Sequence, residues 1–180
     1  MQARDFEQVV MPHLDAAYNL AYWLTRSRAD AQDVVQDACL RAFKYFGTFA
    51  GENPSAWLLS IVRRSCYTWL KRNRGHEESL GIDDDAAAGE IADPMLMMGG
   101  HGLARDPEAL LIEARQGTRL HQLVAALPVE YREVIVLREI EELSYRDIAE
   151  VAGIPIGTVM SRLARARSLL AERWRREQQE

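Results

Sequence analysis

The sequence predicts an all-α protein, built from two small helical domains joined by an acidic flexible linker. Apolar residues recur at helical spacing through residues 4–73 and again through 108–176, and no convincing strand lies between. Residues 76–107 lack such periodicity and carry eight acidic side chains against one basic. A short helix, a glycine turn and a second helix are predicted in residues 144–167. We therefore place the domains at 1–75 and 108–180, with the linker at 76–107.

The charge distribution and the cysteine and histidine positions limit the possible functions. The net charge of −5 divides into +3 for residues 1–75, −7 for the linker and −1 for residues 108–180, so the linker masks basic surfaces elsewhere. No apolar run approaches the roughly 20 residues that span a bilayer, and no signal peptide is expected. Cys39 and Cys66 fit buried free thiols in a reducing cytoplasm. The histidines, at 13, 76, 101 and 121, pair with no cysteine at a ligand spacing, so neither metal nor cofactor is expected.

Three helices are predicted in the first domain. The first covers residues 4–26, and Pro12 either kinks it or separates an initial turn. The second runs from Ala31 to about Phe46 with Asp30 as its cap, and its exposed acid–amide face holds Asp33, Gln36 and Asp37. Such a face is usually only solvated, but it could also dock on a basic partner helix. After a loop at 47–55, a third helix is predicted from Ala56 to about Asn73.

The third helix combines basic and aromatic side chains. Arg63, Arg64 and Lys71 are its basic residues, and Trp57 lies near its start. Basic side chains next to aromatic ones suit single-stranded nucleic acid, because phosphates follow the charge while unstacked bases lie on the rings. The alternative is that most of the aromatic residues, Trp57, Trp69, Phe43 and Phe46, fill the core.

The second domain is predicted to end in a helix-turn-helix. Helices over 108–126, with Leu120 on the buried side, and from Val129 to about Glu139 lead into it. Ser144 caps the short helix, Gly153 stops it and Thr158 is a plausible cap for the next. That last helix has two sides: an apolar stripe of Val159, Leu163, Ala166 and Leu170, and a polar face of Thr158, Ser161, Arg162 and Arg165. The second helix of such a motif fits the DNA major groove, where arginine binds guanine or phosphate. A helical hairpin with a solvated arginine face is the alternative.

Three segments resemble bacterial sigma factors of the extracytoplasmic-function group, in the sigma-70 family. They are ADAQDVVQDACLRAF at 29–43, NPSAWLLSIVRR at 53–64, and the long segment at 126–167 that begins ALPVEYREVIVLREIEELSYRDIAE. The last is highly specific, and the first two lie in the expected order and distance. The resemblance implies a protein without catalysis of its own that binds core RNA polymerase and directs it to promoter DNA in response to stress.

The resemblance also implies roles for particular residues. Docking on polymerase would use Asp33, Gln36 and Asp37. The −10 element would be opened and bound by Asn53, Trp57, Arg63, Arg64 and Lys71. The −35 element would be read by Thr158, Ser161, Arg162 and Arg165, with Arg167 on phosphate. Many members carry asparagine at the position of Arg64 and arginine at that of Met160. Both departures concern base preference and not the binding mode.

Partners and alternatives complete the expectation. The resemblance implies a cytoplasmic monomer, without membrane contact of its own, controlled by an anti-sigma factor to which the apolar segment 95–98 could contribute. A free-standing helix-turn-helix repressor or activator is the competing hypothesis, and it predicts a dimer that binds a palindromic duplex tightly. An enzyme has no support, because no nucleophile–base pair, metal cluster or phosphate loop is recognisable.

Overall fold

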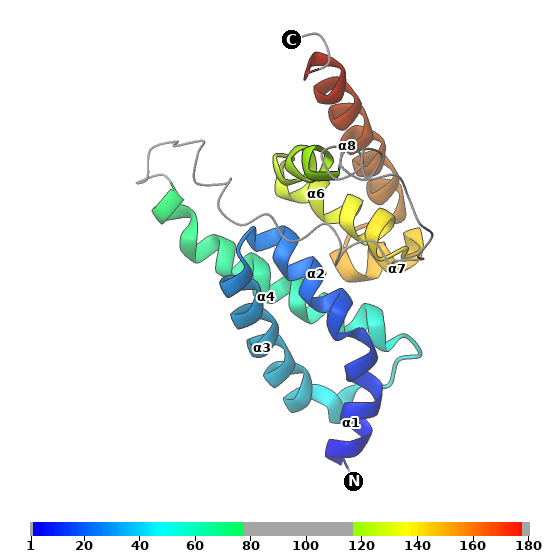
Figure 1. The fold of residues 1–180 in the computed structure, drawn as a ribbon. Helices are drawn as coiled ribbons and strands as arrows, with labels where there is room; N and C mark the ends of the chain where they lie inside the picture. The colour runs from blue at the N-terminus through cyan, green and yellow to red at the C-terminus, as the bar shows by residue number, and fades with distance from the viewer. Residues whose placement is uncertain (1, 78–116, 178–180) are drawn as a thin grey trace, which may run out of the picture.

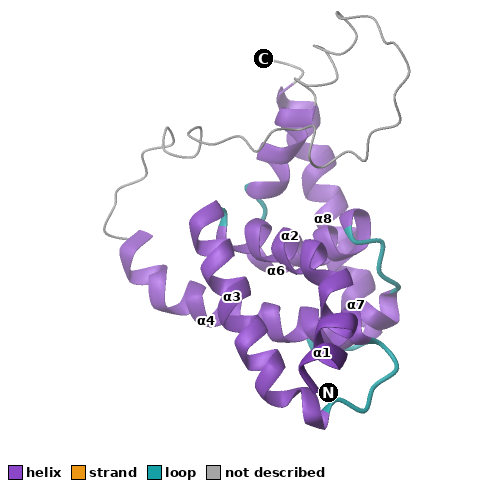
Figure 2. Ribbon diagram, turned by 60° about the horizontal axis from the view of Figure 1, so that its bottom comes forward, coloured by secondary structure: helices purple, strands orange, loops and turns teal. Residues whose placement is uncertain are grey.

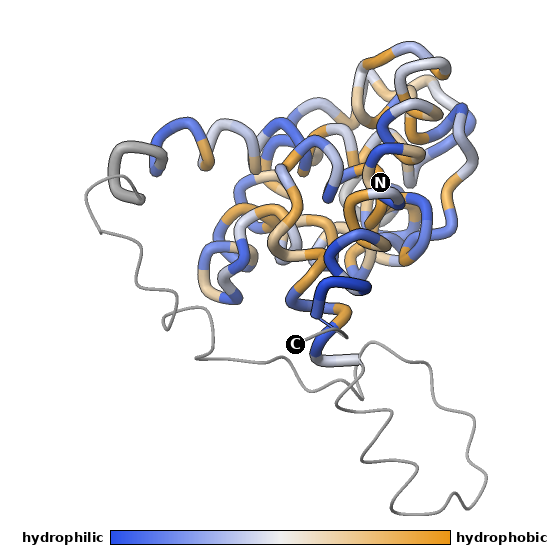
Figure 3. The backbone as a smooth tube through the Cα atoms, turned by 90° about the horizontal axis from the view of Figure 1, so that it is seen from above, coloured by the Kyte–Doolittle hydropathy of each residue, from blue (hydrophilic) through white to orange (hydrophobic). Residues whose placement is uncertain are grey.

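The computed structural model describes residues 2–77 and 117–177, which form helices and connecting turns without any strand (Figures 1 and 2). Most of the predicted linker, the first part of the predicted helix over 108–126 and the apolar segment 95–98 lie outside these described residues. The all-α class predicted from the sequence is confirmed, because the described residues form helices and turns only. Along each helix hydrophobic and hydrophilic segments alternate, as expected of helices that bury only one side (Figure 3).

Pro12 divides the first predicted helix. Helix α1 covers Gln2–Val10, a 3₁₀ turn covers Met11–His13, and α2 covers Leu14–Thr25. Proline has no N–H to donate and cannot continue a helix interior, but it suits the first turn of a new helix. Arg26 caps the end of α2: it has a left-handed φ of 60° and donates its N–H to the carbonyl of Tyr22 at 2.7 Å.

Helix α3, Arg28–Tyr45, begins earlier than predicted. Its cap is Ser27, whose Oγ accepts a hydrogen bond from the N–H of Asp30 at 3.3 Å, so the prediction of Asp30 as the cap is wrong. Serine wins this role because it lies in extended backbone, with φ −139°, one residue before the helix. Asp30 instead lies in the first turn, where its negative charge is favourable.

Helix α4, Pro54–Glu77, completes the first domain and is longer than predicted. It begins two residues before the predicted start and continues past the predicted end at Asn73. Pro54 starts it, as proline commonly does at the first helical position. Helices α2, α3 and α4 pack on one another around a core that includes Leu20, Leu24, Ala38, Leu58 and Val62.

The second domain contains residues 117–125, which are helical, and then α6, Val129–Ile135, which continues as a π-helical turn over Val136–Ile140. Helices α7, Tyr145–Ala152, and α8, Ile156–Glu177, follow. The fully buried side chains of Val134, Leu137, Ile148 and Leu163 join these elements. Leu120 is 50% exposed, so its predicted burial is wrong, whereas Leu123 and Val124 of the same helix are buried.

The two domains lie against each other. Helix α4 of the first domain packs on α7 of the second, and α2 packs on α6 (Figure 1). The sequence predicts two separate domains and gives no sign of this contact. It is important for function because the faces that meet include several residues predicted to bind nucleic acid.

Candidate nucleic-acid interface

Local capping fixes the helix-turn-helix. The Ser144 Oγ accepts a hydrogen bond from the N–H of Asp147 at 3.1 Å, and the Ser144 hydroxyl donates one to the Asp147 carboxylate at 2.6 Å. These two hydrogen bonds fix the first turn of α7. Gly153 ends α7 with a left-handed φ of 66°. Both predictions for α7 are confirmed. Thr158, however, lies inside the first turn of α8 and donates its N–H to the carbonyl of Pro155, so its prediction as the cap is wrong.

Helix α8 presents a polar face opposite its buried stripe. Val159, Leu163 and Ala166 are fully buried against the other helices, as predicted, and Leu170 is half-buried. The remaining predicted positions divide in two: Ser161, Arg165 and Arg167 are exposed, whereas Thr158 and Arg162 are half-buried. The Arg167 guanidinium donates to the Glu139 carboxylate at 2.6 Å, in a pair half-exposed to water.

Asn53 makes two side-chain hydrogen bonds at the start of α4. The Asn53 Oδ1 accepts the N–H of Ala56 at 3.0 Å and so caps the helix. Its Nδ2 donates to the Asp147 carboxylate of the second domain at 2.9 Å. The half-buried Trp57 packs against Phe49, with 4.8 Å between ring centroids, and against Phe46 at 6.3 Å. The aromatic rings thus form a cluster at the edge of the domain.

Two predictions about these aromatic residues have different outcomes. Trp57 and Trp69 are half-buried and pack on the core, as the core alternative predicts. Phe46 is half-buried too, and its ring packs against those of Phe49 and Trp57. Phe43 is 48% exposed and touches Phe6 edge-on at 5.2 Å, so its prediction as a core residue is wrong. It lies on the outer side of α3 because Ala38 and Ala42 fill the inner positions.

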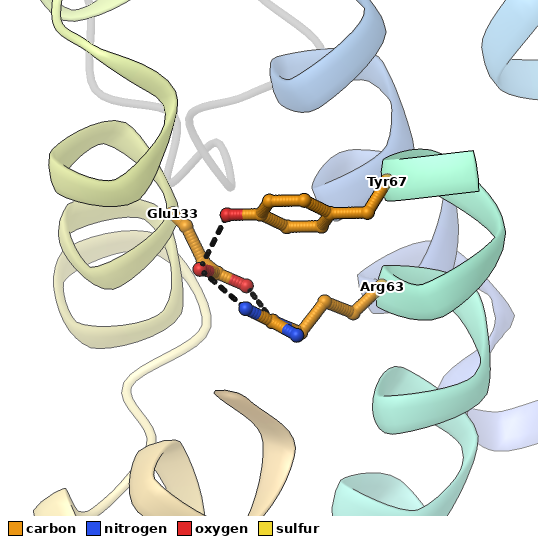
Figure 4. A network of polar contacts seen from close by, with 3 residues as sticks. All are labelled: Arg63, Tyr67 and Glu133. Carbon is orange, nitrogen blue, oxygen red and sulfur yellow. Dashed lines mark hydrogen bonds and ion pairs between the residues drawn. The ribbon is translucent and has the colours of Figure 1, made fainter. Parts of the chain in front are cut away.

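A buried polar network joins the middle of α4 to α6 (Figure 4). The Glu133 side chain is completely buried and accepts hydrogen bonds from the Nε of Arg63, from its Nη2 at 3.4 Å, and from the Tyr67 hydroxyl at 3.0 Å. The Arg63 guanidinium also lies 4.4 Å from the Tyr67 ring centre. A buried carboxylate is tolerated only when it is paired and hydrogen-bonded in this way.

The network shifts the pKa values of Tyr67 and Arg63. Burial, followed by the Glu133 charge, raises the pKa of Tyr67, and the guanidiniums of Arg63 and Arg162 oppose that rise. Burial acts to lower the pKa of Arg63, but hydrogen bonding and attraction to Glu133 outweigh it, so the net change is a rise.

The other predicted residues of the first domain remain open to water. Arg64 and Lys71 are exposed on α4 and do not join the network. Asp33, Gln36 and Asp37 are exposed on α3, and Asp37 pairs with Arg41 at 2.9 Å. The structure therefore brings Asn53 and Arg63 to the domain contact and leaves Arg64, Lys71 and the acid–amide face exposed.

Several residues of this contact are missed by sequence reasoning. Glu133 and Asp147 supply the carboxylates, and Glu141 accepts from the Asn19 side chain at 3.0 Å. His121 packs edge-on against Trp23, with 4.3 Å between ring centroids. The one available signal was Glu133 itself, an acid directly preceding the apolar run Val134–Leu137, at a position that must be buried if α6 is to pack.

Comparison with known proteins identifies the family. The sequence model described as "Sigma-70 region 2" matches residues 9–76, and "Sigma-70, region 4" matches residues 118–170. The ECF RNA polymerase sigma-E factor of Haemophilus influenzae is 33% identical over 154 residues, which cover 82% of this chain and 77% of that protein. The chain belongs to the extracytoplasmic-function sigma factors of the sigma-70 family. Sigma factors are transcription initiation factors and not enzymes.

Two further similarities define how far this relationship extends. The ECF RNA polymerase sigma factor SigE of Mycolicibacterium smegmatis is 29% identical over 93% of this sigma factor, which spans 60% of that relative's length. The sigma factor RpoE of Bartonella quintana, solved in complex with the anti-sigma factor NepR, aligns with a TM-score of 0.67 at 29% identity. That alignment covers 94% of this chain and 96% of the other, so it includes both domains.

Metal-ligand clusters and membrane-spanning helices are both absent from the described residues. Within residues 2–77 and 117–177, no group of three or more histidine, cysteine, aspartate or glutamate side chains could hold a metal ion. Among the helices of those same ranges, none is long and apolar enough to cross a membrane. Cys39 and Cys66 are free thiols; Cys66 is buried, as predicted, whereas Cys39 is only half-buried.

Proposed function

We propose that this sigma factor binds core RNA polymerase in the cytoplasm and directs it to promoters through α8 and α4. The observation that carries the proposal is a capped helix-turn-helix with an exposed serine–arginine face, in a chain whose two halves match sigma regions 4 and 2. In the −35 element, Ser161 and Arg165 contact base edges together with Thr158 and Arg162, and Arg167 binds phosphate. The exposure of Ser161, Arg165 and Arg167 supports this assignment.

The −10 element is assigned to the start and the exposed side of α4. Arg64 and Lys71 attract the phosphates of the opened strand, and Trp57 lies in an aromatic cluster where an everted base can stack. Base eversion costs a few kcal/mol, which stacking and pocket contacts must offset. Asn53 and Arg63 complete the set, although both are engaged with the second domain in this structure.

Docking on polymerase is assigned to the acid–amide face of α3. Asp33, Gln36 and Asp37 lie within one helical turn of each other, and all three are exposed. Exposure of two carboxylates and an amide on one face supports a contact with a basic partner surface. An anti-sigma factor is the proposed regulator, supported by the relative solved with NepR, whose alignment includes both domains. We also propose that the chain acts as a monomer.

Reconstituted transcription tests the proposed function. Purified chain is added to core polymerase with a library of promoter-length duplexes, and RNA synthesis and core binding are both measured. The triple variant Asp33→Ala, Gln36→Ala, Asp37→Ala is expected to lose core binding. A matched control, Asp5→Ala, Glu7→Ala, Gln8→Ala, likewise removes two carboxylates and one amide from exposed positions, here of α1, and should bind normally. Absence of core binding by the unaltered chain at low salt would refute the proposal.

A further inference from the structure

Two large apolar side chains interrupt the polar face of α8. Within the described residues Ile156 is 46% exposed and Met160 is 53% exposed, although both lie on the helix assigned to the −35 element. The core of the second domain uses other positions of this helix, which are Val159, Leu163 and Ala166. Burial in that core therefore does not account for Ile156 and Met160.

The two side chains belong to one row along the helix. Residues four positions apart lie above one another, so Ile156, Met160 and Ala164 follow each other through the first turns of α8. Ser161 and Arg165 each come one position later and form the neighbouring row, and all five residues are exposed. An apolar row and a polar row thus lie side by side on the surface assigned to DNA.

The same surface is open enough for a close approach. Among the described residues outside its own helical turn, nothing lies within 4 Å of a Cβ placed on Gly157, and Ala164 carries only a methyl group. Met160 lies between these two small residues, and its unbranched thioether side chain adapts readily to the shape of a partner. The N-terminal part of the second helix of a helix-turn-helix is also the part that contacts base edges. Met160, in the second turn of α8, is therefore placed to meet a base.

The chemistry of Met160 distinguishes among the base edges. Its side chain has no hydrogen-bond donor, so it cannot bind guanine in the forked manner of arginine. In the major groove adenine, guanine and cytosine present hydrogen-bonding atoms, whereas thymine also presents its C5 methyl group. That methyl group is the apolar surface that a methionine can cover, with release of water from both.

Ser161, next to Met160, favours the same base pair. Its hydroxyl donates to the Thr158 carbonyl at 3.1 Å, so its oxygen is left to accept a hydrogen bond. The N6 amino group of adenine is a suitable donor in the major groove, and adenine is the partner of thymine. Met160 and Ser161 together therefore match the two halves of one A·T pair.

We propose that Met160 selects a thymine in the −35 element by covering the thymine C5 methyl group, while Ser161 accepts a hydrogen bond from the paired adenine. This inference rests on the proposed function and names the base that α8 recognises at one position. The methyl contact involves no charge, so it should change little with salt, unlike the phosphate contact assigned to Arg167.

The test uses holoenzyme reconstituted from the full chain and core polymerase. Holoenzyme selects duplexes from a promoter library randomised over the −35 element, and the bound duplexes are sequenced. The most enriched duplex is then remade with deoxyuridine in place of one thymine at a time, which removes the C5 methyl group and keeps the base pair. Affinity is measured by competition for the unaltered chain, for Met160→Ala and for the control Met11→Ala, which truncates a methionine of similar exposure, 55%, in the first domain.

We expect deoxyuridine at one −35 position to weaken binding by the unaltered chain and by Met11→Ala about fourfold, the size expected for loss of one buried methyl group. Met160→Ala should bind the thymine and deoxyuridine duplexes equally. Met160→Arg, taken through the same selection, should replace the A·T pair at that position by a G·C pair, because arginine binds the O6 and N7 of guanine.

Three results would each overturn the inference: no −35 thymine whose methyl group affects binding, a deoxyuridine effect of the same size in Met160→Ala, or a retained preference for A·T in Met160→Arg. Failure of the proposed function gives a different result, because the unaltered chain then enriches no −35 sequence and supports no promoter-directed RNA synthesis with core polymerase. If the unaltered chain does both while the thymine methyl group has no effect, only the role of Met160 fails.

Discussion

The Arg63–Glu133 pair provides a quantitative test of the domain contact through a double-mutant cycle. The two single variants are Arg63→Met and Glu133→Gln, and the free energy of unfolding is measured for each and for the double variant. Loss of Arg63 leaves the Glu133 carboxylate with no exposed surface and only Tyr67 as a partner, which should cost about 3 kcal/mol or more. Loss of the Glu133 charge should cost less, about 2 kcal/mol, because Arg63 keeps 19% exposure and can be partly hydrated.

The cycle predicts a coupling energy of about 2 kcal/mol between these two residues, so the double variant is far less destabilised than the sum of the singles. Urea unfolding followed by circular dichroism and by tryptophan fluorescence gives the free energies, provided that both probes report the same transition. Where they differ, the cycle is evaluated for each transition separately. Effects that add to within about 0.5 kcal/mol would show that the pair does not interact in solution, and the domain contact would lose its main support.

A glycine, a cysteine and a histidine allow three further tests of the fold. Gly153→Ala should lower the free energy of unfolding by about 1 kcal/mol because φ is 66° while nothing crowds the added Cβ, and Gly153→Asn should cost less in the same urea titration. Burial and the Glu133 charge raise the pKa of Cys66 to about 12, so alkylation at pH 8 should modify Cys39 well before Cys66 in the native protein; equal rates would contradict this burial. Burial lowers the pKa of His121 from 6.5, so its contribution to the free energy of unfolding should be full above pH 6.5 and should decline as the pH falls below that value. His121→Gln should flatten this part of the pH profile of stability, and an unchanged profile would contradict this burial.

The helices and the helix-turn-helix could be predicted because their causes are local. Ser144 and Gly153 fix the ends of α7 through the backbone next to them, and the spacing of Val159 and Leu163 fixes the buried side of α8. The wrong prediction for the cap of α3 also has a local cause. Ser27 and Asp30 are both good capping residues three positions apart, and composition alone does not say which of them lies in extended backbone.

The domain contact could not be predicted, because it depends on pairs far apart in the sequence. Arg63 and Glu133 are separated by 70 positions, and Asn53 and Asp147 by 94. A basic residue on an amphipathic helix gives the same pattern whether it faces water, DNA or another domain. Only the three-dimensional arrangement shows that Arg63 is held by a carboxylate while Arg64, its neighbour, is exposed.

The most direct test of the central claim is promoter-directed RNA synthesis with a reconstituted polymerase. The variant Ser161→Ala, Arg162→Ala, Arg165→Ala removes the assigned −35 contacts, and Ser168→Ala, Arg175→Ala, Arg176→Ala removes the same residue types from exposed positions of the same helix. We predict a loss of about 100-fold or more in the first variant, from contacts worth about 1–3 kcal/mol each, and near-normal synthesis in the second. Equal synthesis by the two variants would contradict the assignment of α8 to promoter DNA.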